Sequence, residues 1–361
     1  RGKMGVGTNR INSIILSKAT RAISRYLTER YESPAMVIGY DTRHNSREYA
    51  DGIAQEFARS GLRCYLFAEP TPVPVVSFAI RQLGLNGGVM ITASHNTKEY
   101  NGYKVYWEDG AQITAPKDVE IVAEVKAITD YHTVKTMSEA DAKAQGLLAI
   151  IGKEIDDAYM VELKKQIVHP EIIKEVADEI KIVYTPLHGT GLVPVKRVLA
   201  ELGFKNVYVV PEQELPDPEF TTLAYPNPED PAAFELAIKL AKKVGADIIL
   251  ATDPDADRLG VYALDTKSGE YVSFTGNMSG MLIAEYLLRE KTKTGTMPEN
   301  PALVKTIVTT NMADVMTKAY NVKEIEVLTG FKYIGEQIKL FEQNHTYNYV
   351  FGLEESYGCL A

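Results

Sequence analysis

A short polar segment, residues 92–96, places a nucleophile beside a potential base directly after an apolar stretch. Ser94 carries a hydroxyl among small and polar neighbours, and the imidazole of His95 follows it. Lys98 and Lys104 bring positive charge that suits phosphate oxygens. A hydroxyl at a strand end is well placed to act as a nucleophile, although a lone serine in a turn more often hydrogen-bonds its own backbone. We expect Ser94 to carry a phosphoryl group.

The neighbours of Ser94 disfavour acyl transfer. A Gly-x-Ser-x-Gly elbow requires glycine at the positions that Thr92 and Asn96 occupy, and a Ser-x-x-Lys motif requires lysine at the position of Thr97. Phosphoryl transfer is therefore the better interpretation of this segment.

A second polar segment concentrates carboxylates after an apolar run. Asp253, Asp255 and Asp257 alternate along it and follow residues 248–251. Oxygen ligands at this density suit Mg²⁺, which prefers carboxylates, water and phosphate oxygens; the alternative is a solvated acidic turn. Without a cation, the three negative charges would repel one another. A Mg²⁺ ion that also touched phosphorylated Ser94 would neutralise charge as the phosphoryl group leaves.

Two other classes of site match this aspartate segment only in part. An EF-hand also begins Asp-x-Asp-x-Asp, but its sixth position is Arg258 here instead of glycine, and its twelfth is Leu264 instead of glutamate. The Asp-x-Asp-x-Thr motif of aspartyl-phosphate phosphatases has threonine where this chain has Asp257. A phosphatase with Asp253 as nucleophile stays open as an alternative. Arg258 is expected to hold a phosphate oxygen by a bidentate contact.

Strands and helices alternate along the whole chain, which predicts an α/β fold. Three predicted strands run into polar loops, at residues 92–96, 253–258 and 354–357. Because ligands gather at the carboxyl ends of strands in open α/β sheets, we expect three sheets that face one central cleft. The predicted strands are 35–39, 87–91, 181–184, 247–251, 303–308 and 347–351, and the clearest helices are 46–60, 231–244 and 278–289.

Composition and charge narrow the class of protein. The net charge of -9 is spread over 361 residues, and no basic segment with interleaved aromatic residues indicates a nucleic-acid surface. No apolar stretch approaches the roughly 20 residues that a membrane span needs. Cys64 and Cys359 are too few for a disulfide framework. We expect a soluble, cytoplasmic protein that binds a small molecule and neither nucleic acid nor membrane. The sequence leaves the oligomeric state open, with a monomer slightly favoured.

Four motifs in the same order resemble those of α-D-phosphohexomutases, most closely the bacterial phosphoglucomutase branch. The resemblance covers nearly the whole chain. It rests on residues 92–96 with Tyr100-Asn101-Gly102-Tyr103-Lys104, on 184–191 (Tyr-Thr-Pro-Leu-His-Gly-Thr-Gly), on 253–258, and on 354–358 (Glu-Glu-Ser-Tyr-Gly).

The resemblance implies three consecutive mixed α/β/α sandwich domains. A charged stretch of weak periodicity at 138–154 and a turn-rich stretch at 265–276 predict where they meet. We place a phosphoserine domain at 1–152, a metal-binding domain at 153–265 and a sugar-recognition domain at 266–361.

The resemblance also implies a phosphoglucomutase, an intramolecular phosphotransferase of the isomerase class that interconverts glucose 1-phosphate and glucose 6-phosphate. Phosphorylated Ser94 would donate its phosphoryl group to the sugar phosphate. Glucose 1,6-bisphosphate would form, act as activator, and return its other phosphoryl group to the serine. Ser94, His95, Lys104 and Arg258 would be catalytic, with His95 and Lys104 sharing the acid and base work; Ser94, Asp253, Asp255 and Asp257 would bind Mg²⁺; and Glu354, Ser356, Lys332, Lys305 and Arg1 would contact the sugar phosphate.

The family has a fourth, carboxy-terminal domain whose loop grips the non-reacting phosphate, and the residues after Gly358 do not resemble it. We expect this domain to be absent from residues 1–361. Turnover by these residues alone should then be poor, because remote phosphate contacts supply binding energy that is used at the reacting centre.

Two further functions stay open. Phosphomannomutase or phosphopentomutase activity would use the same mechanism on another sugar. A catalytically idle sugar-phosphate binding module would bind ligand without phosphorylation, and replacing Ser94 would leave it unaffected.

Overall fold

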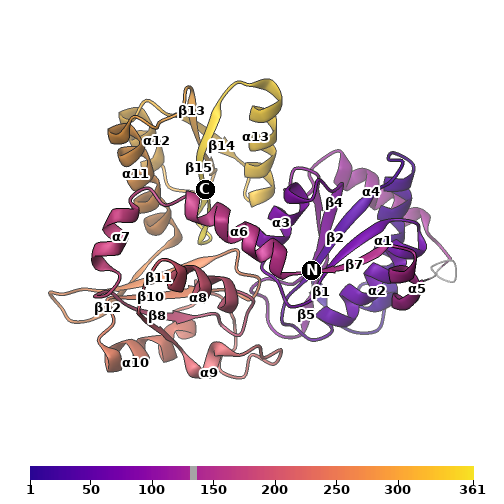
Figure 1. Ribbon diagram of the computed structural model, residues 1–361, viewed down its shortest axis with the longest axis horizontal. Helices are drawn as coiled ribbons and strands as arrows, with labels where there is room; N and C mark the ends of the chain where they lie inside the picture. Colours follow the sequence, from indigo (N-terminus) through magenta and orange to yellow (C-terminus); the bar gives the residue numbers. More distant parts are fainter. Residues whose placement is uncertain (131–135) are drawn as a thin grey trace. The chain divides into compact units, whose positions relative to one another are not determined.

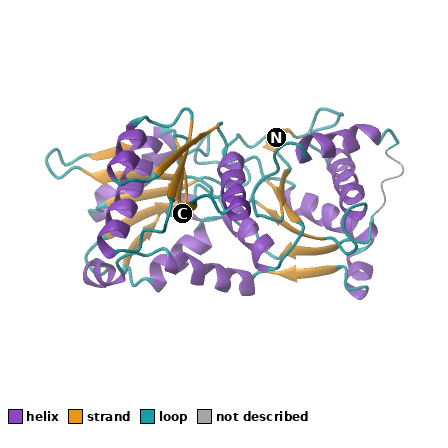
Figure 2. Cartoon of the chain, turned by 90° about the horizontal axis from the view of Figure 1, so that it is seen from above, coloured by secondary structure: helices purple, strands orange, loops and turns teal. Residues whose placement is uncertain are grey.

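The computed structural model describes residues 1–130 and 136–361, which form two compact units. The first unit contains Arg1–Tyr159 and the short segment Pro216–Ala224, and the second contains Met160–Leu215 and Tyr225–Ala361. The chain therefore passes between the units three times. Figure 1 shows the order of the elements, and Figure 2 shows strands flanked by helices.

The first unit is built on a five-stranded sheet in the order β6-β4-β2-β3-β7. Four strands are parallel and β6, at one edge, is antiparallel to β4. A two-stranded ribbon of β1 and β5 accompanies it. The strands are β1 (Gly2–Lys3), β2 (Ala35–Tyr40), β3 (Arg63–Phe67), β4 (Gly87–Ile91), β5 (Tyr100–Asn101), β6 (Lys104–Trp107) and β7 (Leu148–Ile151).

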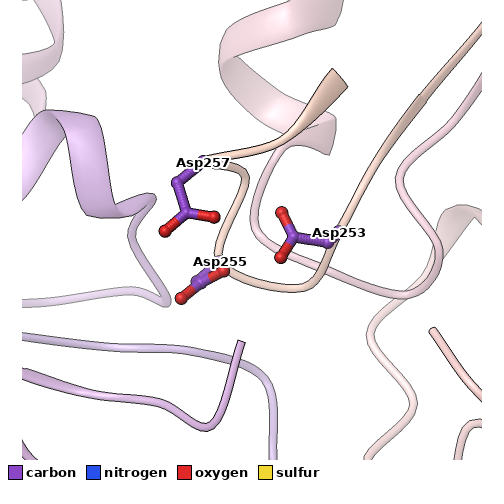
Figure 3. A group of neighbouring side chains, drawn as sticks. All are labelled: Asp253, Asp255 and Asp257. Atoms are coloured by element: carbon purple, nitrogen blue, oxygen red, sulfur yellow. The ribbon is translucent and has the colours of Figure 1, made fainter. Parts of the chain in front are cut away.

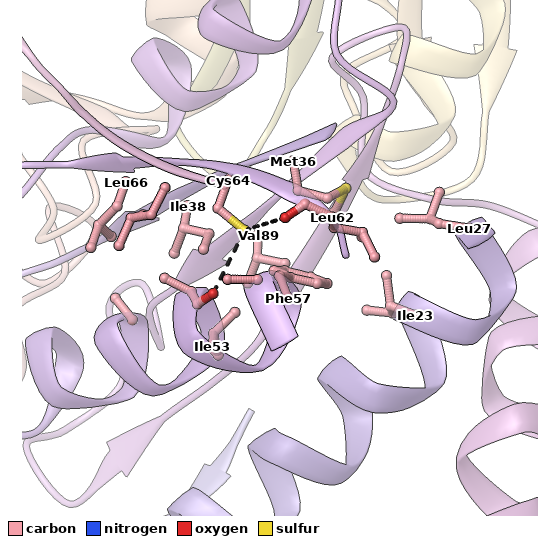
Figure 4. Packing of buried hydrophobic residues seen from close by; sticks show 14 of the residues in the cluster. Ile23, Leu27, Met36, Ile38, Ile53, Phe57, Leu62, Cys64, Leu66 and Val89 are labelled. Atoms are coloured by element: carbon pink, nitrogen blue, oxygen red, sulfur yellow. Dashed lines mark hydrogen bonds between the residues drawn. The ribbon is translucent and has the colours of Figure 1, made fainter. Parts of the chain in front are cut away.

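Both faces of this sheet are buried, as β2 shows. Met36 and Ile38 belong to one apolar cluster, which Figure 4 shows, whereas Val37 belongs to a second cluster on the other face. Successive strand residues point to opposite faces, so a strand buried on both sides must be continuously apolar. The helices that contribute to these layers are α1 (Ser13–Thr28), α2 (Ser46–Arg59), α3 (Val73–Gln82), α4 (Lys117–Ala127) and α5 (Glu139–Ala144), while α6 (Lys153–Lys165) leads out of the unit.

The first half of the second unit holds a five-stranded sheet in the order β12-β11-β10-β8-β9. Its β8, β9 and β10 are parallel, and β11 and β12 extend it in antiparallel fashion. The strands are β8 (Lys181–Thr185), β9 (Asn206–Val209), β10 (Ile248–Thr252), β11 (Leu259–Leu264) and β12 (Tyr271–Phe274), and the helices are α7 (Pro170–Val176), α8 (Leu192–Glu201), α9 (Pro211–Glu214), the 3₁₀ turn η2 (Pro231–Phe234) and α10 (Glu235–Val244).

The second half holds a four-stranded sheet in the order β14-β13-β15-β16, with only β16 antiparallel. Leu303 and Phe351 pack with residues of α11 and α12, whereas Ala302 and Val304 pack with residues of α13. This sheet therefore lies between two helical layers. Its strands are β13 (Pro301–Thr306), β14 (Lys323–Val327), β15 (Asn348–Glu354) and β16 (Gly358–Leu360), and its helices are α11 (Gly276–Thr294), α12 (Met312–Ala319) and α13 (Phe331–Asn344).

The α/β prediction is confirmed, and five of the six predicted strands have ends shifted by one to three residues. The expected strand 303–308 begins at Pro301 and stops at Thr306, because the Thr309 amide turns back to donate to the Thr306 carbonyl. Glu354, expected in a loop, is the last residue of β15. In the described part of the chain, no helix combines the length and apolar character that crossing a membrane requires.

Candidate active site

Ser94 lies in the loop that follows β4, an interior strand between β6 and β2 of the first sheet. Its side chain is buried and its φ of 53° lies in the left-handed region. The Ser94 amide donates to Thr92 Oγ1 at 2.8 Å, and Ser94 Oγ lies 3.1 Å from Nδ1 of His95. Non-glycine residues adopt this backbone conformation only where the surroundings enforce it, and such residues cluster at functional sites. The hydroxyl and the imidazole therefore lie within hydrogen-bonding distance of each other.

Lys104 and Arg1 lie beside this loop. Lys104 opens β6 opposite Met90 of β4, and its side chain is buried. Arg1 precedes β1, which pairs with β5. Gly102 makes the close approach possible, because a Cβ on it would stand 2.5 Å from the Thr92 carbonyl oxygen and 3.2 Å from the Arg1 Cα. Two cationic residues thus accompany the serine loop.

Lys98 pairs with a carboxylate of the protein, although its charge alone suggested a contact with phosphate. Its ammonium donates to Glu219 at 2.6 Å, and the other oxygen of that carboxylate lies 2.6 Å from Nε2 of His44. The carboxylate raises the pKa of the Lys98 ammonium by this hydrogen bond and by its charge. Much of the Lys98 charge is therefore balanced within the protein.

Sequence reasoning missed Asp41 and Arg43, which support the serine loop from the neighbouring strand end. Both are buried, and Arg43 Nε lies 3.2 Å from Asp41 Oδ2. Burial raises the pKa of Asp41 above 3.8, although the charge of Arg43 and hydrogen bonds to the carboxylate oppose this. The available signal was their position directly after β2, which is the same strand-then-loop position that singled out Ser94.

The three aspartates follow β10 in the second unit, and their carboxylates converge (Figure 3). One oxygen from each lies within 4.8 Å of the others, and both Asp253 and Asp255 are fully buried. Burial raises the pKa of Asp253 well above 3.8, and the charges of Asp255 and Asp257 raise it further. A divalent cation would remove this repulsion, so the cluster fits a hard metal ion such as Mg²⁺.

The loop after β8 supports the aspartate loop. A Cβ on Gly189 would stand 2.4 Å from the Pro254 Cα, and the amide and hydroxyl of Thr190 both donate to the Pro254 carbonyl at 2.9 and 3.0 Å. Gly191 is equally tight, because its added Cβ would stand 2.4 Å from Thr252 Oγ1. Glycine is therefore required at 189, where two backbones touch, and at 191, where the side chains of Thr252 and Tyr184 leave no room for a Cβ.

Arg258 is anchored beside the aspartates. Its amide donates to Asp253 Oδ1 at 3.2 Å, and its guanidinium pairs with Glu229 and lies 3.4 Å from Asn227 Oδ1. The guanidinium of Arg258 is thus already paired with the carboxylate of Glu229. A phosphate that binds Arg258 has to share or displace that partner.

Glu354 and Ser356 lie at the end of β15. The Gly330 amide donates to Glu354 Oε1 at 2.5 Å, and Ser356 Oγ donates to Glu354 Oε2 at 3.4 Å. Burial raises the pKa of Glu354 above 4.5. The Leu259 amide donates to the Tyr357 carbonyl at 3.0 Å, so the backbone links this loop to the strand that follows the aspartates.

The two predicted lysine contacts differ in environment. Lys332 lies in the first turn of α13 with its ammonium 4.7 Å from the centre of the Tyr333 ring. Lys305 is fully buried in β13, with Nζ 3.0 Å from Glu326 and 3.6 Å from Glu324 and Asp314. Burial opposes charge on Lys305, but the carboxylates outweigh it and raise the pKa above 10.5. The structure therefore places Lys305 in an internal ion network.

The site elements divide between the two units. A serine loop with His95, Lys104 and Arg1 belongs to the first, and an aspartate triad with Arg258, Glu354 and Ser356 belongs to the second. The serine, the aspartates and Glu354 occupy the carboxyl ends of strands, where open α/β sheets bind ligands. Each unit is thus an α/β structure with polar side chains at the carboxyl ends of its strands.

Three family models match the chain in succession. They describe phosphoglucomutase/phosphomannomutase α/β/α domain I at residues 1–132, domain II at 157–266 and domain III at 275–361. The chain belongs to the phosphoglucomutase/phosphomannomutase family, the α-D-phosphohexomutases, and consists of three consecutive α/β/α domains.

Curated phosphoglucomutases are similar in sequence to the whole of this chain. Phosphoglucomutase of Staphylococcus epidermidis is 36% identical over 362 residues, and that of Staphylococcus aureus is 35% identical over 361. The matches cover 100% of this chain but 64% and 63% of those proteins, so the chain spans less than two thirds of their length.

Solved structures share the fold. A putative phosphomannomutase from Thermus thermophilus superposes with a TM-score of 0.76 at 24% identity, covering 99% of this chain and 73% of its own. Parafusin, a phosphoglucomutase from Paramecium, gives 0.71 at 18% identity, covering 96% and 63%.

Proposed function

We propose that this chain acts as a phosphoglucomutase, an isomerase that interconverts glucose 1-phosphate and glucose 6-phosphate through phosphorylated Ser94. The observation that carries the proposal is the buried Ser94 hydroxyl, 3.1 Å from Nδ1 of His95, on a residue whose φ of 53° lies in the left-handed region. The curated phosphoglucomutases, 35–36% identical along the whole chain, support glucose phosphate as the substrate.

Each half-reaction moves one phosphoryl group. The bond between phosphorus and Ser94 Oγ breaks, and a sugar hydroxyl forms a new bond to phosphorus. A base takes the proton of that hydroxyl, and a proton finally reaches Ser94 Oγ. His95 and Lys104 are the candidates for this acid and base work. The resulting glucose 1,6-bisphosphate returns its other phosphoryl group to Ser94 by the reverse step.

Asp253, Asp255 and Asp257 would hold Mg²⁺, and their converging carboxylates support this assignment. When bound, the ion supplies positive charge that stabilises the phosphoryl group in transit. Arg258 would contact a phosphate oxygen, in exchange with Glu229. Arg1 would add positive charge beside the serine.

Recognition of the sugar falls to the second unit. Glu354 can accept hydrogen bonds from sugar hydroxyls, and Ser356 can donate to them. Lys332 would contact the substrate phosphate. We assign Lys305 to the stability of β13 because three carboxylates surround its buried ammonium.

Phosphate transfer to the chain tests the proposal directly. The protein is incubated with glucose 1,6-bisphosphate and Mg²⁺, and peptide mass spectrometry locates any phosphate. We expect phosphate on Ser94, none in Ser94→Ala, and wild-type labelling in Ser33→Ala, a control at an exposed serine of the same domain. Phosphate on Asp253 instead would indicate an aspartyl-phosphate phosphatase. Binding without phosphorylation would indicate an idle binding module.

A coupled assay then compares glucose 1-phosphate, mannose 1-phosphate and ribose 1-phosphate, with and without a trace of bisphosphate. Preference for the glucose ester supports the substrate assignment. Preference for mannose or ribose would replace it and leave the serine mechanism standing.

A further inference from the structure

The side chain of Arg43 binds backbone carbonyls of the loop that carries Ser94, residues 92–101. One terminal nitrogen donates to the carbonyls of Ser94, at 2.5 Å, and Asn96. The other donates to the carbonyls of Thr97 at 2.8 Å and Tyr100 at 3.3 Å. A single side chain therefore binds four carbonyl groups of the segment that carries the nucleophile.

Only arginine fits this arrangement. A guanidinium offers five N–H donors in a rigid plane. Two pairs serve the four carbonyls, and Nε faces Asp41 Oδ2 at 3.2 Å. Asp41 is itself fixed, because it accepts from the Arg43 amide at 3.0 Å and from Ser46 Oγ at 2.7 Å. Lysine has the same charge but only three donors on one atom, so it cannot hold the loop in the same way.

A segment distant in sequence covers the guanidinium. Residues 216–224 belong to the first unit, although in the sequence they come between β9 and β10, which are strands of the second unit. The Phe220 ring centre is 5.1 Å from the guanidinium carbon of Arg43, and Phe220 is 3% exposed. Beside it, Glu219 pairs with Lys98 and His44. Water is therefore kept from the guanidinium, which strengthens its hydrogen bonds to the loop.

The conformation of Ser94 is what this support maintains. Its φ of 53° is unfavourable for a residue with a Cβ and persists only where the surroundings impose it. The Arg43 bond to the Ser94 carbonyl acts on the residue itself, and the other three bonds act on the turn that follows. An incorrectly placed nucleophile loses rate steeply, since a shift of about 1 Å can cost on the order of 100-fold.

We propose that Arg43 is a positioning residue that holds Ser94 in its reactive conformation, and that Phe220 keeps Arg43 in place. This inference rests on the proposed function of Ser94 as phosphoryl carrier. Arg43 acts through the backbone and is not assigned any contact with substrate.

The test measures transfer from glucose 1,6-bisphosphate to Ser94 in the presence of Mg²⁺, followed by intact-protein mass spectrometry. In this step a P–O bond of the bisphosphate breaks and a Ser94 Oγ–P bond forms. The serine proton ends on the released sugar oxygen, which gives glucose monophosphate. Rate constants are determined as a function of bisphosphate concentration, which separates the rate of transfer from the half-saturating concentration.

Arg43→Lys is compared with Arg59→Lys, a matched change at an exposed arginine at the end of α2. We expect Arg43→Lys to lower the transfer rate constant about 10- to 100-fold with half-saturation changed less than about twofold. Arg59→Lys should match wild type. An Arg43→Lys protein that folds and is phosphorylated at the wild-type rate would overturn the proposal.

Phe220 variants decide the question if Arg43→Lys does not fold. Phe220→Leu keeps an apolar cover and should stay near wild type, whereas Phe220→Ala admits water and should lower the rate constant about fivefold or more. Equal rates for the two variants would overturn the proposal.

A separate measurement distinguishes failure of this inference from failure of the proposed function. Absence of phosphate on Ser94 in the wild type would defeat the proposed function. Hydrogen exchange of residues 94–101 then tests Arg43 alone: faster exchange in Arg43→Lys and Phe220→Ala supports positioning, and unchanged exchange refutes it.

Discussion

Gly189 and Pro254 are in backbone contact, so close that a Cβ on the glycine would stand 2.4 Å from the Pro254 Cα and 2.7 Å from its carbonyl oxygen. Pro254 lies between two of the three aspartates. The glycine loop after β8 and the aspartate loop after β10 therefore form one structural piece. Their parent strands are parallel neighbours in the sheet, which brings the two loops to the same edge.

Gly189→Ala is expected to disturb this contact and with it the metal site. Overpacking of this kind costs about 1–3 kcal/mol. We expect a lower unfolding temperature and a smaller rise in that temperature on addition of Mg²⁺, both measured by calorimetry. Gly52→Ala is the control, because its added Cβ meets nothing within 4 Å in the middle of α2. A Gly189→Ala protein with wild-type stability and Mg²⁺ response would contradict the close contact.

Asp255→Asn should stabilise the metal-free protein and abolish the Mg²⁺ response. The charge of Asp255 raises the pKa of buried Asp253, which shows that the two carboxylates repel each other. Removing one charge should add about 1 kcal/mol or more to the free energy of unfolding in EDTA. Denaturant titration with and without Mg²⁺ measures both effects, and Glu212→Gln, at an exposed site in α9, should alter neither. Retention of the wild-type Mg²⁺ effect would argue against the triad as the metal site.

Glu56 is expected to make the first unit less stable as pH rises. Its side chain is fully buried on α2, Arg21 Nη1 is 3.7 Å away, and within the described residues neither carboxylate oxygen has a hydrogen-bond donor. Burial raises its pKa from 4.5 to about 7, against the charges of Arg21 and Arg59. The pKa of Glu56 is higher in the folded than in the unfolded protein. The stability that protonated Glu56 contributes is therefore fully present below pH 4.5 and is lost as the pH rises through about 7.

Glu56→Gln should remove this pH dependence. We expect its free energy of unfolding to exceed that of wild type by about 1–3 kcal/mol at a pH near 8, and by less near pH 5. Glu48→Gln, at an exposed position on the same helix, keeps the wild-type pH profile in this scheme. If the slopes for Glu56→Gln and wild type coincide, Glu56 is not the group responsible.

Lys305→Met separates a structural role from a substrate contact. Removing the buried ammonium leaves Asp314, Glu324 and Glu326 without their shared cation. Because these side chains are 44%, 19% and 49% exposed to water, we expect the loss to cost about 1–3 kcal/mol. We expect a large fall in unfolding temperature, while Lys323→Met, at an exposed end of β14, stays near wild type. Wild-type stability with a raised KM for glucose 1-phosphate would restore the substrate contact.

Local patterns were sufficient to predict six of the strands, among them β4 and β10, and the polar residues that follow those two. Residues 87–91 are apolar and Ser94 comes directly after them, so strand and candidate nucleophile could be recognised within one short window. The same holds for β10 and Asp253. The end of β13 was predicted too late because Ile307 and Val308 continue the apolar, β-branched pattern, although both are exposed, and a turn closes on Thr306.

Individual charges were harder to interpret. The charge of Lys98 was expected to suit phosphate, and the family resemblance implied a substrate contact for Lys305. In the structure Glu219 pairs with the first lysine, and three carboxylates lie near the ammonium of the second. A lysine looks the same in sequence whether its partner is a ligand or an internal carboxylate. The partner of Lys98 lies 121 residues away, so no local window includes it.

The sequence by itself determined the alternation of strands and helices, the order of the four motifs and the kinds of atoms that each loop presents. Hydrophobic periodicity and side-chain chemistry are local properties, so they can be recognised in the sequence without the structure. Only the tertiary structure decided that Arg43 holds the loop of Ser94, that Phe220 covers Arg43, and that Gly189 contacts Pro254. These relationships depend on which strands become neighbours and on where a distant segment packs, and the free energy that selects them comes from burial of the whole core.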